Sequence, residues 1–62
     1  MKINVGKGRY TVIVHKESEG GYYGQCLELP GAISEGKTVN ELKENMTDVI
    51  QLVLQFLQAR AS

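Results

Sequence analysis

Residues 38–60 read TVNELKENMTDVIQLVLQFLQAR, and this stretch decides the fold because its apolar residues recur with the spacing of one long helix. The stretch contains no glycine and no proline that would interrupt a helix. Thr38 followed three residues later by Glu41 predicts a capping box, in which each side chain accepts a hydrogen bond from the other residue's free backbone N–H. We therefore predict a helix from Val39 to about Arg60, roughly 33 Å long at about 1.5 Å per residue.

The apolar face of this predicted helix widens toward its C-terminal end. Val39, Leu42 and Met46 form a narrow stripe in the first half, which suits packing on a sheet. Beyond Val49 the apolar arc grows from roughly 100° to about 200°. One small sheet cannot cover such an arc, so we expect this part of the helix to join copies of the chain in a homodimer or tetramer. The residues expected at that interface are Leu52, Leu54, Phe56 and Leu57. The alternative is that the strands curl round the helix and cover all of it.

Upstream of the helix, alternating apolar residues predict three or four antiparallel strands, at 1–5, 9–15, 22–29 and 32–35. Glycines lie between the first three segments, and Pro30-Gly31 ends the third, because proline cannot continue a central ladder. The whole chain, residues 1–62, is thus predicted to be a single α+β domain. Its expected architecture is a three- to four-stranded antiparallel sheet followed by one long C-terminal helix packed on one face.

A single helix covers only one face of a sheet, so the strand alternation predicts which residues remain outside. If Tyr10, Val12 and Val14 face the helix, Ile13 lies on the other face. On the strand at 22–29 we place Cys26 inward, and one tyrosine stays outside whichever set faces the helix. A cluster of such residues would form a second contact surface.

Composition narrows the function classes. Seven basic and seven acidic residues give a formal net charge of zero, and no basic cluster is present, so direct nucleic-acid binding is not expected. No apolar run approaches the roughly 20 residues of a membrane helix. The lone Cys26 excludes a disulfide within the chain and is typical of a reducing compartment. We expect a cytoplasmic chain, with association as the source of stability that a 62-residue domain usually needs.

The residue types that carry chemistry are sparse. His15 and Cys26 are the only soft metal ligands, whereas a structural zinc needs four, so neither metal nor cofactor is expected. We interpret His15 as an ordinary residue at a strand end and Cys26 as a small buried apolar residue. The carboxylates are scattered, without a spacing that demands a shared acid–base role. An enzyme is therefore not expected.

The motifs of residues 9–57 together resemble the HicB-like antitoxin family, which also includes small stand-alone uncharacterised members. The strand pattern Tyr-x-Val-x-Val is followed in order by Leu29-Pro30-Gly31 and by a Gly-x-Thr-x-x-Glu helix start, here Gly36, Thr38 and Glu41. The resemblance implies a partly degraded ribonuclease-H-like fold that lacks the catalytic acids. It also implies an antitoxin of a type II toxin–antitoxin system that binds and neutralises a HicA-type mRNA-cleaving toxin.

The sequence departs from the family pattern in three places. Leu27 stands where members often have proline, and Ala32 where they often have cysteine. Many members carry a C-terminal DNA-binding module, whereas this chain stops at Ser62, so autorepression through a second domain is not expected. The motif residues themselves have structural interpretations: the turn after a strand for Leu29, Pro30 and Gly31, and the helix start for Gly36, Thr38 and Glu41.

Two other functions remain open. One is a stand-alone self-associating protein-interaction module without a toxin partner, which the wide apolar helix favours. The other, a residual nuclease, rests on analogy of fold alone.

Overall fold

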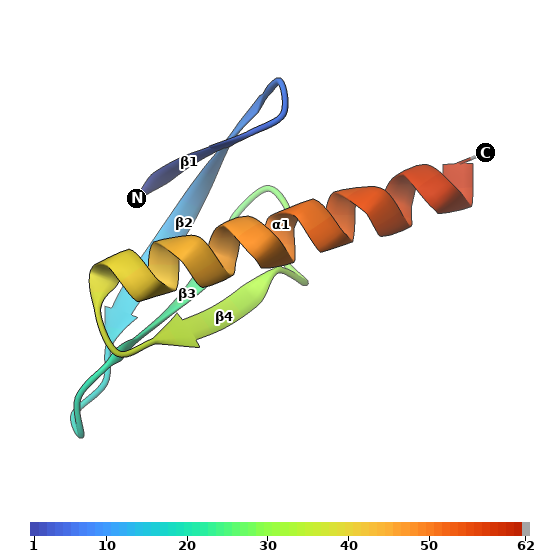
Figure 1. Ribbon diagram of the computed structural model, residues 1–62. Helices are drawn as coiled ribbons and strands as arrows, with labels where there is room; N and C mark the ends of the chain where they lie inside the picture. The colour runs from blue at the N-terminus through green and yellow to red at the C-terminus, as the bar shows by residue number, and fades with distance from the viewer. Residues whose placement is uncertain (62) are drawn as a thin grey trace.

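One helix crosses one face of a four-stranded antiparallel sheet in the computed structural model, which describes residues 1–61 (Figure 1). Ser62, where the chain stops, lies outside the described residues. The elements are β1 (Lys2–Val5), β2 (Gly8–Lys16), β3 (Tyr22–Cys26), β4 (Ile33–Gly36) and α1 (Val39–Ala61). The predicted α+β architecture is confirmed, with four strands and a helix that begins where the sequence placed it.

The strands follow one another across the sheet in the order β1-β2-β3-β4, so every connection is a hairpin. The long strand β2 serves two partners: its first half pairs with β1, with Lys2 opposite Thr11. Its second half pairs with β3, from Val12 opposite Cys26 to Lys16 opposite Tyr22. Gly20 and Gly21 have φ angles of 100° and 88°, which side-chain-bearing residues rarely adopt, and they allow the turn between β2 and β3.

Strand β3 is shorter than the sequence predicts, and the prediction that it reaches Leu29 is wrong. It ends at Cys26 because the chain turns back at once. The N–H of Ala32 donates to the carbonyl of Leu29 at 2.8 Å, and the N–H of Cys26 donates to the carbonyl of Ala32 at 3.0 Å. The turn is therefore already formed by the time the chain reaches Pro30, and β4 begins at Ile33.

The core lies between the sheet and α1. Val12 and Cys26 point into it, as predicted, whereas Ile13 and Gln25 lie on the opposite, exposed face. The buried residues are Ile3, Val5, Val12, Cys26, Ala32, Leu42, Met46 and Ile50. They come from all four strands or their flanks and from the first three turns of the helix, so the core ends near the middle of α1.

The start of α1 is capped, though not in the predicted way. The N–H of Glu41 donates to Thr38 Oγ1 at 3.1 Å, which is the first half of a capping box. Glu41 Oε1, however, accepts from the N–H of Lys37 at 3.3 Å rather than from that of Thr38. The acidic side chain therefore reaches one residue further back, onto the segment that joins β4 to the helix.

Candidate functional site

The C-terminal end of α1 extends beyond the sheet, and three apolar side chains in this part of the helix are left exposed. The molecule measures 42 × 18 × 16 Å, and Figure 1 shows that the helix accounts for its length. Leu52, Phe56 and Leu57 are 66%, 60% and 45% exposed. We call these three residues the helix-end surface. The alternative in which the strands curl round the helix and cover it is wrong for the described chain.

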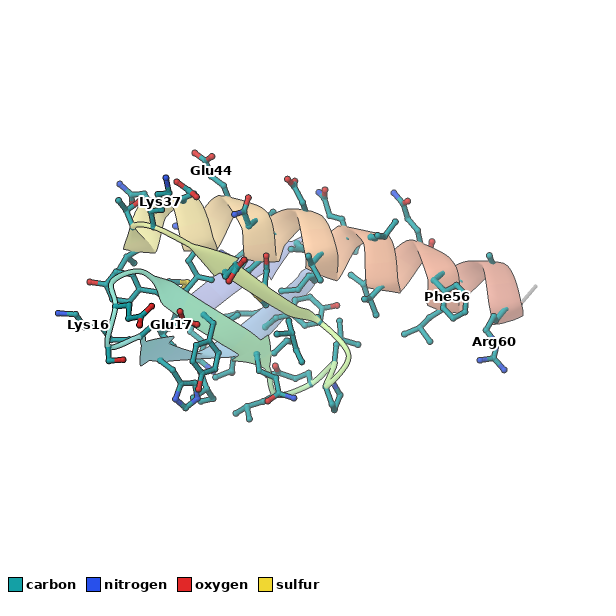
Figure 2. All side chains as sticks on the ribbon, turned by 90° about the horizontal axis from the view of Figure 1, so that it is seen from below. Lys16, Glu17, Lys37, Glu44, Phe56 and Arg60 are labelled. Atoms are coloured by element: carbon teal, nitrogen blue, oxygen red, sulfur yellow. The ribbon has the colours of Figure 1, made fainter. Side chains whose placement is uncertain are left out.

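The geometry separates Leu54 from the other residues that the sequence placed at an interface. Leu54 is half-buried and packs against the core together with Val53. In contrast, Figure 2 shows Phe56 and Arg60 on the part of α1 that lies past the sheet. The Arg60 guanidinium carbon lies 5.8 Å from the centre of the Phe56 ring, so one face of this ring has a cation beside it. The interface itself stays a prediction.

A second uncovered apolar surface lies on the face of the sheet away from the helix. Ile13, Tyr23, Leu27 and Ile33 are 40%, 39%, 59% and 54% exposed, and we call them the outer-face patch. The register places Ile13 opposite Gln25, and Gln25 opposite Ile33, so the patch spans three strands. The sequence indicated Ile13 and one tyrosine here. Alternation with the inward Cys26 also places Leu27 on this face, together with Tyr23 and Gln25. The sequence could not indicate that Ile33 joins them, because its place depends on the pairing of β4 with β3.

An aromatic pair extends this patch on its β2 side. The rings of His15 and Tyr23 stack with their centres 4.7 Å apart and an angle of 13° between their planes. The two residues are opposite each other in the register of β2 and β3. His15 thus lies on the outer face, whereas Cys26 is buried on the inner face, so the two do not form a nucleophile–base pair.

One backbone and one side-chain hydrogen bond join the turn after β3 to β2. The N–H of Val12 points toward β1 and donates to the carbonyl of Met1. Because the backbone groups of successive strand residues point to opposite sides, the N–H and carbonyl of Thr11 point toward β3. There the carbonyl of Thr11 accepts from Leu27 N–H at 2.9 Å. The Thr11 N–H donates to Glu28 Oε1 at 2.8 Å. The carboxylate of Glu28 takes the position of the next backbone acceptor, which the shortened strand does not supply.

This arrangement lowers the pKa of Glu28 to about 2, mainly because its carboxylate accepts the Thr11 N–H. The Cys26 thiol lies 3.5 Å from the same Oε1 and donates to it. Burial raises the pKa of that thiol, which keeps it protonated and makes it a weak nucleophile. Within residues 1–61 no group of three or more histidine, cysteine or acidic side chains is placed to hold a metal ion.

The family-motif residues divide into those that the fold requires and those that it leaves exposed. Leu29 packs against the core, whereas Pro30 and Gly31 are exposed. The carbonyl of Pro30 accepts from the Gln25 side chain at 3.0 Å. A Cβ added at Gly31 would meet no atom within 4 Å, and Gly31 does not have a positive φ. Neither space nor backbone conformation therefore requires glycine at position 31.

Gly36 is required by the contact between β4 and α1. A Cβ at this position would lie 2.5 Å from the backbone nitrogen of Leu42, closer than real Cβ atoms come. The Asn45 side chain strengthens the same junction by donating to the carbonyl of Glu35 at 2.7 Å. The bare Gly36 backbone thus lets the first turn of the helix lie directly on the edge strand.

No helix within residues 1–61 is both long and apolar enough to cross a membrane. Comparison with family models finds no match, and none of the solved structures matches either.

Relatives of the chain are found among curated sequences. UPF0150 protein ssr1765 of Synechocystis sp. is 42% identical over 50 residues, which are 81% of this chain but only 63% of that protein. UPF0150 protein ssl0738 of the same organism is 37% identical over 79% of this chain and 68% of its own length. UPF0150 protein Ta0767 of Thermoplasma acidophilum is 34% identical over 81% of this chain and 72% of its own length. These names state no activity and no partner, but the identity and coverage show that the chain belongs to the UPF0150 family.

Proposed function

We propose that this chain is an antitoxin-like protein that associates with itself and neutralises a HicA-type mRNA-cleaving toxin by binding it. The observation that carries the proposal is the helix-end surface, a large apolar area that no described part of the chain covers. Exposed apolar patches of this kind mark sites of protein binding. The resemblance of the Leu29-Pro30-Gly31 and Gly36–Glu41 motifs to the HicB-like family supplies the kind of partner.

Covering the helix-end surface with a partner would contribute a few kcal/mol to binding. Full burial of a leucine or phenylalanine side chain is worth about 1.5–3 kcal/mol. Leu52, Phe56 and Leu57 are roughly half exposed, so covering them gains about 2–5 kcal/mol per subunit. Association costs about 4–15 kcal/mol in lost translational and rotational freedom. The helix-end surface alone therefore supports a weak dimer, and a tight complex needs further contacts.

The partners in this proposal are proteins rather than nucleic acids or membranes. Equal numbers of basic and acidic residues supply no field that would attract phosphates. An antitoxin against an mRNA-cleaving enzyme works in the cytoplasm, and it needs neither a metal nor a catalytic group of its own. No enzymatic activity is proposed for the chain.

Co-expression tests the antitoxin proposal directly. The chain is produced together with the small open reading frame next to its gene, and growth and complex formation are measured. We expect the neighbouring protein alone to stop growth, and the pair to restore growth and to purify as one complex. A neighbour that is harmless and does not bind the chain would refute the antitoxin function.

A matched pair of variants tests whether the helix end is used. Leu52→Glu places a charge on the apolar side of α1, whereas Gln55→Glu places the same charge on its exposed polar side. We expect Leu52→Glu to lower self-association and Gln55→Glu to leave it unchanged. Equal sedimentation of both variants and the parent would show that this surface is not an interface.

The second candidate is a self-associating module without a toxin partner. It is favoured by the presence of two separate apolar surfaces, the helix-end surface and the outer-face patch, on one small domain. This version requires concentration-dependent association of the purified chain. A strictly monomeric chain at high micromolar concentration would exclude it, whereas an oligomer that ignores the neighbouring protein would support it.

A further inference from the structure

The outer-face patch has a symmetric arrangement of side chains along the strands. Ile13 lies next to the centre of β2, with Arg9 four residues before it and Glu17, just past the strand, four residues after it, so all three alternate onto the same face. The ladder continues to Glu17, because its N–H donates to the carbonyl of Gly21 at 3.0 Å. Arg9 and Glu17 are each about 14 Å from Ile13 along the strand.

The neighbouring strand repeats the arrangement with apolar residues. Gln25 is opposite Ile13 in the register, with Tyr23 two residues before it and Leu27 two residues after it. Ile33 is opposite Gln25 on β4. A central row therefore crosses the sheet through Ile13, Gln25 and Ile33. Along the strand direction, the basic Arg9 lies on one side of this row and the acidic Glu17 lies on the other.

We propose that the outer face binds the same face of a second copy, with a two-fold axis along this central row. The rotation turns one sheet over onto the other and reverses the strand direction. Arg9 then lies opposite Glu17 of the second copy, and Tyr23 lies opposite Leu27 of the second copy. Ile13 and Ile33 lie near their own counterparts. Face-to-face sheets pack about 10 Å apart with strands within about 30° of each other, which this arrangement allows.

The charges select a second copy, and they select this orientation of it. An axis parallel to the strands would instead place Arg9 opposite Arg9, and it would add the exposed Lys2 to the same end. Like charges in contact disfavour that orientation. The chain has no net charge, but on the outer face its positive and negative charges lie at opposite ends. The surface that best complements this face is therefore the same face of a second copy, turned over. Isologous contacts of this kind are the commonest form of self-association.

This inference goes beyond the proposed function, because it requires neither a toxin nor the helix-end surface. It is tested in a Leu52→Glu background, so that the remaining association reports on the sheet. Arg9→Glu and Glu17→Arg are compared singly and together by sedimentation equilibrium. We expect each single change to weaken association about 3–30-fold, because each one acts at both ends of a symmetric dimer. The double change restores opposite charges and should return association to within about 3-fold of the background.

A crosslinking measurement tests the position of the axis. Gln25→Cys places a thiol on the axis, where a thiol crosslinker of about 10 Å reach joins two copies across the packed sheets. Glu44→Cys is the control, because Figure 2 shows Glu44 pointing away from the sheet. We expect covalent dimers for Gln25→Cys and none for Glu44→Cys.

Three outcomes would overturn the inference. One is that single charge changes leave association unaltered. Another is that the double change fails to restore it. The third is a chain that stays monomeric while these variants abolish binding of the neighbouring protein, which would assign the outer face to a different partner.

Discussion

Replacing Gly36 by alanine should push the first turn of α1 away from β4 and destabilise the domain. The added Cβ would lie 2.5 Å from the nitrogen of Leu42 and 2.9 Å from the carbonyl carbon of Glu41. Both neighbours are backbone atoms, so no side chain can swing aside to make room. The helix start must move instead, and Leu42, which is completely buried, moves with it.

The size of the effect follows from two opposing contributions. Overpacking of this kind destabilises a protein by about 1–3 kcal/mol. Loss of glycine also restricts the unfolded chain, which stabilises the folded state by about 0.4–1 kcal/mol. We expect a net loss of about 1–2 kcal/mol from a domain whose total stability, by its length, is about 3–9 kcal/mol. In a chain of this size that loss lowers Tm by about 5–15 °C.

Urea and thermal unfolding followed by circular dichroism measure the change, with Gly31→Ala as the matched control. A Cβ at Gly31 meets nothing within 4 Å, and its φ is not positive, so the control should keep or slightly exceed the stability of the parent. All chains are compared at one protein concentration, because association adds stability. If Gly36→Ala were as stable as Gly31→Ala, the close contact between β4 and α1 would be refuted.

Four further changes test other parts of the fold and site. Leu52→Glu should leave the free energy of unfolding of the monomer, from urea titration, within about 0.5 kcal/mol of the parent, because its side chain is 66% exposed; a large loss would mean that the residue is buried. The pKa of Glu28 is lowered from 4.5 to about 2, so its contribution to stability is present above pH 4.5 and is lost as the pH falls to about 2. Glu28→Gln should therefore lose less stability than the parent between these pH values in urea titrations, and parallel curves would contradict the hydrogen bond to Thr11. Met46→Ala removes a fully buried side chain and should lower the free energy of unfolding by about 2–5 kcal/mol. Much of the chain should then be unfolded, which NMR spectra would show as a loss of dispersed signals. Thr38→Ala should lower stability by about 0.5–2 kcal/mol while Thr38→Ser retains it, and equal Tm values for all three would show that the cap is unimportant.

The elements whose pattern repeats locally could be predicted from the sequence. The apolar spacing from Val39 onward sets the helix, and the alternation around Val12 sets which face of β2 is buried. The capping threonine is also a local signal, because its partner lies three residues away. Each of these features depends on residues a few positions apart in the chain, and patterns of that length are visible in a single sequence.

The features that depend on distant partners could not be predicted. Glu28, which follows the early end of β3, accepts a hydrogen bond from Thr11, a residue 17 positions away, and nothing near Glu28 in the sequence shows this. The reach of Glu41 to Lys37 depends on how β4 meets the helix. The outer-face patch depends on β4 lying beside β3, which brings Ile33 next to Gln25. Local periodicity carries no information about the order of strands.

The exposed apolar residues at the end of α1 are unfavourable for the isolated domain. Isolated helical segments of a few turns are marginal in water, and most helical stability in proteins comes from packing. The turns around Phe56 extend past the sheet, so Leu52, Phe56 and Leu57 expose apolar surface that favours aggregation, although Leu54 still packs against the core. Arg60 complements the helix dipole but covers only one side of the Phe56 ring. A polar sequence would suit an uncovered helix end better, and an apolar one stabilises the protein only when further protein surface covers it.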